Sequence, residues 1–470
     1  MERWITVQYI ENKTYDNIRI GDTAELTRTL RSEDIELFAV MSGDVNPAHV
    51  DEEYAKSDRF HEIIAHGMWG GALISAVLGT ELPGPGTIYV NQSLNFRRPV
   101  GLGDTVTVRV TVKEKIADDH RVKLDCLCLN QDGDIVIEGE AEVIAPSDKV
   151  RRPRVLLPEI HLHERGAQYR RLITASADLD PITTAVVHPC DVLSLTAALD
   201  AKTQGMVEPI LIGPRAKIEQ TAQAAKLSLD NVAIIDVPHS HAAAAEAVQS
   251  VRRGQAAAIM KGALHTDELM AAVVDRHTGL RTERRMSHLF VLDVPHYAKL
   301  LFITDAALNI APDLNAKRDI VQNAIDLAHA LGIEQPKVAI LSAVETVSRQ
   351  LPSTIEAAAL CKMAERGQIT GGLVDGPLAF DNAVSKAAAA TKTINSPVAG
   401  DADILVAPDL ESANMIAKQL IYLAGAQAAG LVIGARVPIM LTSRADDNLA
   451  RLTSCVLAQL FVNRIQHHAL

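Results

Sequence analysis

The chain has 470 residues, of which 48% are hydrophobic and 22% are charged, and its formal net charge is −12. This composition excludes an intrinsically disordered protein, and an acidic chain without a dense basic patch is not expected to bind nucleic acid. The length exceeds what one core usually organises, so we expect at least two domains, and the five scattered cysteines predict neither a disulfide framework nor a zinc cluster.

The N-terminus and the most hydrophobic later stretch bear on where the protein resides. Residues 1–7 have neither the basic lead nor the apolar run of a signal peptide, and the apolar stretch at 420–441 is interrupted by Gln427 and Arg436. We therefore expect a cytoplasmic protein without a membrane span, whose partners are small molecules.

The segment from Ser42 to His49 holds the first candidate site. Proline fixes its own φ and keeps the preceding residue out of the helical region, so Asp44 and His49 flank a turn at Asn46-Pro47 and can face one pocket. A positioned acid and base are what the addition of water to a double bond conjugated to a thioester requires. Asp, Asn and Pro are also common turn formers, so a structural turn with a surface histidine is the alternative.

Residues 65–79 predict one strongly apolar helix that is entered through Gly67. The amide of Gly67 can face a carbonyl oxygen, and the positive helix end would stabilise charge that develops there. Four β-rich segments follow at 88–96, 104–112, 122–130 and 135–143, separated by Gly, Asp and Asn turns. The order predicts an α+β domain in which an antiparallel sheet wraps one buried helix.

These residues match a known family. Residues 1–147 resemble the MaoC-like, (R)-specific enoyl-CoA hydratases of the hotdog fold, through Ser42-Gly43-Asp44-x-Asn46-Pro47-x-His49-x-Asp51 and Ala65-His66-Gly67-Met68. The resemblance implies that Asp44 and His49 hold the attacking water and act as acid and base, and that the Gly67 amide stabilises the thioester oxygen. Asn46 belongs to the same site, where we expect it to brace the loop rather than touch substrate.

Residues 148–172 are rich in Pro, Arg, Lys and His without a sustained period, which predicts a linker between this domain and a second one at 173–470. Its basic residues are either a solvated connection or part of a site for the phosphates of CoA.

The second domain alternates short apolar runs with alanine-rich helical stretches. The runs lie at 209–213, 232–237, 256–260, 300–304, 338–341, 404–406 and 437–441. Strands that alternate with helices predict an α/β domain with a largely parallel sheet, whose ligands bind at loops after the strand ends.

Polar clusters follow several of these runs. They contain Lys261, then Thr304, Asp305 and Asn309, then Asp375, Asp381 and Asn382, and finally Ser443, Arg444 and Asp446. Each cluster alone can be a helix cap, but their convergence argues for a site. None of them forms a Walker loop or a dinucleotide-binding glycine motif.

The same clusters resemble those of the phosphate acetyl/butyryl transferases, over about residues 170–465. The motifs are Met260-Lys261-Gly262 with Thr266-Asp267, Thr304-Asp305-Ala306-x-x-Asn309, Asp375-Gly376-Pro377-Leu378 with Asp381-Asn382, and Ser443-Arg444-Ala445-Asp446. The resemblance implies an isocitrate-dehydrogenase-like fold of two subdomains that exchanges an acyl group between CoA and orthophosphate without metal or nicotinamide.

The resemblance also implies roles in the last cluster. Ser443 would hold the reacting thioester carbonyl or thiol, and Arg444 would clamp phosphate with two hydrogen bonds. The acetyl-specific branch has a catalytic aspartate six or seven residues after the serine, where this chain has Leu449 and Ala450. The Ser-Arg-Ala-Asp form looks more like the butyryltransferase branch, so we expect Asp446 to be the base, with helix capping as the alternative.

The polar segment at 281–288 offers Arg284 and Ser287 as ligands of phosphate or CoA, with an exposed loop as the alternative.

The sequence thus predicts a bifunctional acyl-CoA enzyme: an enoyl-CoA hydratase fused to a phosphate acyltransferase. CoA and orthophosphate would be substrates, no cofactor would be bound tightly, and the chain would form a homo-oligomer. Two alternatives remain. The second domain can be an inactive CoA-binding or oligomerisation domain, or a metal-dependent decarboxylating dehydrogenase of the same fold.

Overall fold

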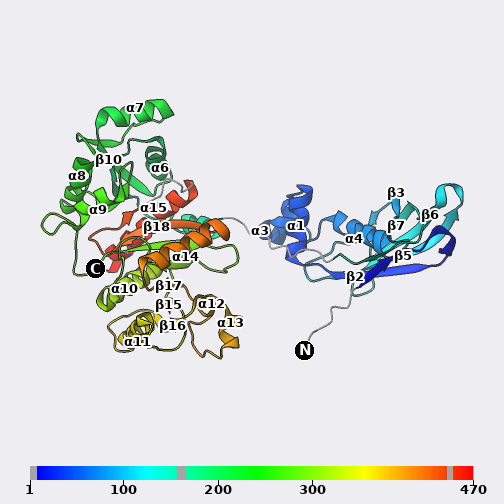
Figure 1. Cartoon of the computed structure of the whole chain (residues 1–470). Helices are drawn as coiled ribbons and strands as arrows, with labels where there is room; N and C mark the ends of the chain where they lie inside the picture. The colour runs from blue at the N-terminus through cyan, green and yellow to red at the C-terminus, as the bar shows by residue number, and fades with distance from the viewer. Residues whose placement is uncertain (1–7, 156–165, 442–447, 469–470) are drawn as a thin grey trace. The chain divides into compact units, whose positions relative to one another are not determined.

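The computed structural model describes residues 8–155, 166–441 and 448–468. The chain divides into two compact units, Met1–Leu162 and His163–Leu470, and each is described by itself (Figure 1). None of the helices in the described residues combines the length and the apolar character needed to cross a membrane.

The first unit is a six-stranded sheet around one central helix, α4 (Gly67–Thr80). Five strands run in the order β2-β5-β6-β7-β3, and β4 pairs with β7; every pairing is antiparallel. The bounds are β2 Thr23–Thr29, β3 Ile88–Gln92, β4 Asn95–Phe96, β5 Thr105–Ile116, β6 Arg121–Leu129 and β7 Ile135–Ile144. This confirms the predicted hotdog fold, with helix and strands close to the ranges expected.

The core of this unit lies between α4 and the sheet. On β5 every second side chain is buried from Val106 to Val112, as expected for a strand that is covered on one face. A Cβ atom at Gly70 would lie 2.4 Å from Cδ1 of Ile137. Glycine at this position therefore lets α4 pack closely on β7.

Shorter elements precede α4. They are β1 (Tyr9–Glu11), the 3₁₀ turn η1 (Tyr15–Asn17), α1 (Ser32–Ser42), α2 (Pro47–Val50) and α3 (Glu52–Ser57). A second 3₁₀ turn, η2 (Asp118–His120), joins β5 to β6. The segment expected to be a linker contains β8 (Arg151–Pro153), which pairs with β1, and the beginning of α5 (Ala167–Ala175). The exact domain boundaries stay a prediction.

The second unit is built on an eleven-stranded sheet in the order β11-β10-β9-β12-β19-β18-β13-β14-β17-β15-β16. The strand bounds are β9 Ile182–Val187, β10 Val207–Gly213, β11 Ala233–Asp236, β12 Ala258–Lys261, β13 Ser287–Asp293, β14 Leu301–Thr304, β15 Lys337–Leu341, β16 Leu373–Leu378, β17 Ile404–Val406, β18 Gln427–Ile433 and β19 Ile439–Met440. The predicted α/β class with a largely parallel sheet is confirmed.

Helices flank this sheet, and α15 packs against β18, a strand in the middle of the sheet (Figure 1). Their bounds are α5 Ala167–Ala175, α6 Val192–Thr203, α7 Arg215–Ala225, α8 Ser240–Arg252, α9 Thr266–Val274, α10 Leu314–Ala330, α11 Pro352–Glu365, α12 Phe380–Val384, α13 Lys386–Thr391, α14 Leu410–Leu423 and α15 Asn448–His468.

Strand direction reverses in the middle of the sheet. The strands from β11 to β19 are parallel to one another, and so are those from β14 to β16. Between the two sets, β19 to β18, β18 to β13 and β13 to β14 are each antiparallel. Three reversals leave the two sets running in opposite directions, so their carboxyl ends lie at opposite edges of the sheet. The polar clusters expected to converge therefore follow strands of both sets, and their convergence stays a prediction.

Candidate functional site

The loop from Gly43 to Asn46 places Asp44. Helix α1 ends at Gly43, whose φ of +75° lies in the left-handed region that favours glycine. The N–H of Asp44 donates to Oγ of Ser42 over 3.2 Å, and Oδ1 of Asp44 accepts from the N–H of Asn46 over 3.2 Å. Asn46 is the N-cap of α2, where its Oδ1 accepts from the N–H of Ala48. Its side chain therefore caps α2, the helix that carries His49.

His49 lies on α2, and a hydrogen bond to the backbone of Ile64 orients its ring. Its Nδ1 is 2.8 Å from the carbonyl oxygen of Ile64. Because a carbonyl oxygen only accepts, Nδ1 carries the hydrogen and Nε2 of the neutral ring keeps its lone pair. One carboxylate oxygen of Asp44 and one ring nitrogen each of His49 and His66 lie within 4.8 Å of one another. This spacing suits a shared water molecule, and the three residue types are also ligands that a transition-metal ion accepts.

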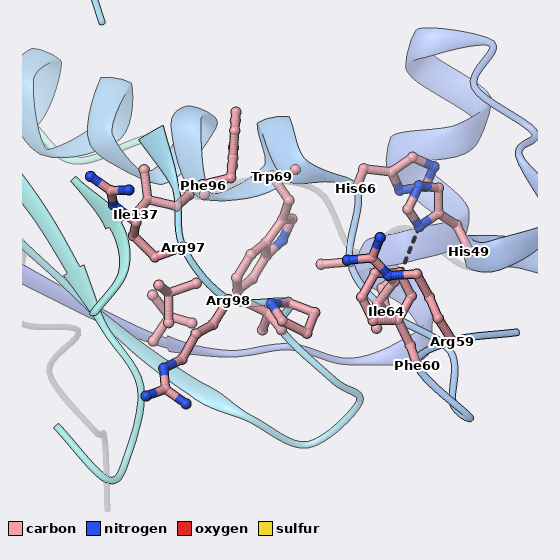
Figure 2. A pocket seen from close by; sticks show the side chains of 17 residues that line it. His49, Arg59, Phe60, Ile64, His66, Trp69, Phe96, Arg97, Arg98 and Ile137 are labelled. Carbon is pink, nitrogen blue, oxygen red and sulfur yellow. Dashed lines mark hydrogen bonds between the residues drawn. The ribbon is translucent and has the colours of Figure 1, made fainter. Parts of the chain in front are cut away.

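A cavity of about 280 Å³ opens beside this group. Figure 2 shows His49 and His66 at one end of it, away from Arg97 and Ile137. Its other lining residues are mostly apolar: Phe60, Ile64, Ala65, Gly67, Trp69, Gly70, Phe96, Pro99, Val100, Val106 and Val136, together with Arg59 and Arg98. Apolar walls next to a few convergent polar groups are the usual form of a small-molecule site.

Three arginines line this cavity, and two of them are paired with carboxylates. The guanidinium of Arg59 lies over the ring of Phe60, 4.7 Å from its centroid. Arg97 forms an ion pair with Glu138, and Arg98 forms one with Asp134 over 3.3 Å. A ligand with an apolar tail matches the walls, and an anionic group on it could approach Arg59, for which the described residues offer no carboxylate partner.

Gly67 is the first residue of α4 and lines the same cavity. The first N–H groups of a helix have no acceptor within the helix, so the amide of Gly67 is available to a ligand. A Cβ atom at this position would lie 3.2 Å from Cε1 of Phe96. The first unit thus brings Asp44, His49 and Gly67 into one site.

In the second unit, a buried network joins one predicted cluster to the segment before β13. The carboxylate of Asp305 accepts from the N–H groups of Ala307 and Leu308, each over 3.0 Å, and from the N–H and side-chain amide of Asn309. Oδ1 of Asn309 in turn accepts from Nε of Arg285 over 2.6 Å. Thr304 is buried beside them, and its hydroxyl donates to the carbonyl of His288. These bonds hold the loop after β14 in place.

The segment 281–288 is not simply an exposed loop. Ser287 is completely buried, and its Oγ accepts from Nδ2 of Asn323 over 2.9 Å. The next residue, His288, is also buried, and desolvation lowers its pKa to about 4, opposed by the charge of Asp305. Arg284 forms an ion pair with Asp326.

Arginines gather around a larger cavity of about 970 Å³ beside this segment. Arg284 lines it together with Arg281 and Arg285 of the same polar segment, with Asn309, and with Arg276, which the sequence did not single out. The density of arginine at 281–285 was the available signal for this segment. Four carboxylates line the same cavity, those of Asp275, Glu283, Asp313 and Asp319, so the arginines do not leave its lining with a net positive charge.

The remaining predicted residues within the described ranges come from other elements. Lys261 ends β12 and Asp375 lies on β16, so they belong to the two oppositely directed sets of strands. Asn382 donates to Glu345, and Asp381 lies in the first turn of α12. Ser443, Arg444 and Asp446 lie outside the described residues.

Two family models match the chain. The model described as "Phosphate acetyl/butaryl transferase" matches residues 240–458, and the model described as "MaoC like domain" matches residues 18–125. The first match falls within the second unit, and the second match falls within the first unit. Both resemblances expected from the sequence are thereby confirmed.

Individual proteins show the same division. A phosphate acetyltransferase of Rhizobium meliloti is 61% identical over 298 residues, which cover 63% of this chain and 94% of that protein. A branched-chain phosphotransacylase structure from Enterococcus faecalis V583 is 29% identical, with a TM-score of 0.53, and the match covers 60% of this chain and 99% of that chain. An (R)-hydratase structure from Pseudomonas aeruginosa is 45% identical, with a TM-score of 0.32, over 33% of this chain and 99% of that chain. The expected relation to isocitrate dehydrogenase stays a prediction.

Proposed function

The chain belongs to the phosphate acetyl/butyryl transferase family and carries a MaoC-like domain ahead of the transferase unit, and from this premise we propose a bifunctional acyl-CoA enzyme. The first unit hydrates trans-2-enoyl-CoA to (R)-3-hydroxyacyl-CoA. The second unit transfers an acyl group between CoA and orthophosphate.

The observation that carries the hydratase proposal is the position of Asp44 and His49 beside a cavity that the first amide of α4 lines. His49 presents Nε2 because its Nδ1–H is bound to Ile64, and the carboxylate of Asp44 lies close by. Together they take one proton from a water molecule, whose oxygen bonds to the β-carbon, and deliver one proton to the α-carbon. The enoyl thioester thereby gains the elements of water.

Negative charge develops on the thioester oxygen while water adds. The N–H of Gly67, at the positive end of α4, is available to donate to that oxygen. A donor that is already oriented stabilises the enolate-like transition state more than the ground state, which is the requirement for catalysis.

The arginines of the cavity support a CoA thioester as the substrate. Arg59, Arg97 and Arg98 line it together with apolar side chains. CoA contains phosphate groups, which a long flexible arm separates from the thioester. Arginine binds phosphate through a planar set of hydrogen-bond donors. The acyl group would then lie against the apolar walls while the arginines attract the phosphates.

In the second unit, an oxygen of orthophosphate attacks the thioester carbonyl, the bond from carbon to sulfur breaks, and the thiolate takes up a proton to give free CoA and acyl phosphate. Arg444 would clamp phosphate, Ser443 would hold the carbonyl or the thiol, and Asp446 would serve as base. Among the described residues, Arg284 and Arg285 offer donors to phosphate groups from the lining of a separate cavity of this unit.

The acyl group is a further part of the proposal. The names of the relatives include acetyl and branched-chain acyl groups, so the family accommodates more than one chain. We propose that the hydroxyacyl product of the first unit is among the acyl groups accepted by the second. CoA and orthophosphate act as substrates, without a tightly bound cofactor, in a homo-oligomer.

The test follows free thiol release from acetyl-, butyryl- and 3-hydroxybutyryl-CoA, with and without orthophosphate. Phosphate-dependent release supports the transferase, and the preferred acyl group tells whether the two units act in sequence. No release with any of these substrates would leave a hydratase that carries a CoA-binding or assembly domain. Hydration is measured in parallel with crotonyl-CoA.

A further inference from the structure

His66 lies at the centre of the hydratase site, and the mechanism above gives it no role. It is the N-cap residue of α4, yet its side chain makes no capping bond to that helix. Ser, Thr, Asp and Asn are the residues that usually cap a helix, so helix formation does not explain a histidine here. The side chain is 2% exposed and therefore is not a surface group.

The imidazole of His66 instead reaches the loop that carries Asp44, 22 residues earlier in the chain. Nε2 lies 2.9 Å from the backbone carbonyl oxygen of Asp44. A carbonyl oxygen only accepts, so Nε2 donates. Nδ1 has no hydrogen-bond partner among the residues that the structure describes, which leaves the bond to Asp44 as the polar contact that orients the ring.

The ring also touches two other elements of the site. It lies against the imidazole of His49, with ring centroids 4.1 Å apart (Figure 2), and it stacks on Phe38 of α1 with a centroid distance of 4.9 Å. The residue that follows it is Gly67, which lines the cavity. One side chain therefore connects the acid and base pair to the amide that would stabilise the thioester oxygen.

We propose that His66 is a positioning residue of the hydratase, whose Nε2–H fixes the backbone of Asp44 at a set distance from the start of α4. The inference rests on the proposed hydratase function. Asp44 has two further restraints, the bond from Asn46 to its Oδ1 and the bond from its own N–H to Oγ of Ser42, but neither partner lies on α4. The bond from His66 restrains the loop that carries Asp44 relative to α4.

The expected consequence is a loss in turnover rather than in substrate binding. A displacement of about 1 Å in a catalytic group can reduce the rate on the order of 100-fold, while the apolar walls and the arginines of the cavity remain in place. We therefore expect kcat to fall and KM to change little when the donor is lost.

The experiment compares three variants of the full-length protein in the hydration of crotonyl-CoA. His66→Gln places an amide N–H near the position of Nε2, whereas His66→Asn places it near that of Nδ1, too short to reach the carbonyl of Asp44. His66→Phe keeps an aromatic ring next to Phe38 and His49 but has no donor. We expect kcat of the Gln variant within about threefold of wild type, and a loss of at least about tenfold in the Asn and Phe variants, with KM within about twofold.

The outcomes separate this inference from the function on which it rests. Equal kcat values in the Gln and Asn variants would overturn the positioning role, even if the Phe variant does not fold. Full activity of the Phe variant would overturn it as well. If the wild-type protein does not hydrate crotonyl-CoA, the proposed function fails and this inference fails with it.

Discussion

Replacing Gly67 by proline removes one hydrogen-bond donor from the hydratase site while leaving the helix intact. Gly67 is the first residue of α4, a position at which proline is favoured because its missing N–H has no partner in the helix. His66, the residue before it, has a ψ of 132°, which is within the range that a residue preceding proline adopts. The backbone therefore accepts proline without a change of conformation.

The matched control is Gly67→Ala. Both substitutions add a Cβ atom, which would lie 3.2 Å from Cε1 of Phe96, and the Phe96 side chain is 53% exposed and free to move. The two variants thus share the added Cβ atom; proline in addition replaces the hydrogen on nitrogen by its ring, as is tolerated at the first position of a helix. Removal of one donor from an oxyanion hole typically lowers kcat about 100-fold to 1,000-fold, or about 2.7 to 4 kcal/mol.

The assay follows the ultraviolet absorbance of the conjugated enoyl thioester, which is lost when crotonyl-CoA is hydrated. We expect kcat and kcat/KM of Gly67→Pro to fall together by that factor relative to Gly67→Ala, because the donor acts in the transition state. The fluorescence of Trp69, which is buried on the same helix, reports whether the unit is folded. If a folded proline variant is as fast as the alanine variant, the amide of Gly67 does not stabilise the thioester oxygen.

Three further predictions concern both units. His49→Gln should lower hydration by at least about 100-fold and leave phosphate-dependent thiol release unchanged, and Ser443→Ala should do the reverse; a loss of both activities in either variant would contradict two separate sites. Arg59→Ala should raise KM for crotonyl-CoA about twofold to fivefold with kcat unchanged. The increase in KM should be smaller at high salt, because salt screens the attraction between arginine and phosphate. An unchanged KM at low salt would count against phosphate binding by Arg59. Burial lowers the pKa of His288 to about 4, so the unfolded chain takes up a proton below about pH 6.5 that the folded unit does not bind. Its unfolding free energy should therefore fall between pH 6.5 and 4, by up to about 1.4 kcal/mol per pH unit, and calorimetry of His288→Leu should lack this part of the slope.

The hydratase site illustrates what local sequence can determine. Asp44 and His49 flank a turn because Asn46 and Pro47 restrict the backbone between them, and this restriction acts within a few residues. The buried helix and the antiparallel strands were predicted for a similar reason, since their apolar periods of 3.6 and 2 are properties of short segments.

The transferase unit shows where such reasoning fails. Strands β13 and β18 were not predicted, since Ser287 and His288 at the start of β13 and Gln427 at the start of β18 are polar, although all three are buried. These two strands produce the reversal in the middle of the sheet. A local period carries no information about the direction in which a strand pairs, so the opposite directions of the two sets of strands could not be foreseen.

The sequence by itself determined the two families, the two fold classes and the residues expected to do the chemistry, because motifs and periods are local. Only the tertiary structure decided which of these residues share a site. The bonds from His66 to Asp44 and from Arg285 to Asn309 join residues 22 and 24 positions apart, and Ser287 of β13 accepts a hydrogen bond from Asn323 of α10. Such contacts form only when separate elements pack together, since the donor and acceptor are brought within about 3 Å by the fold and not by their spacing in the chain.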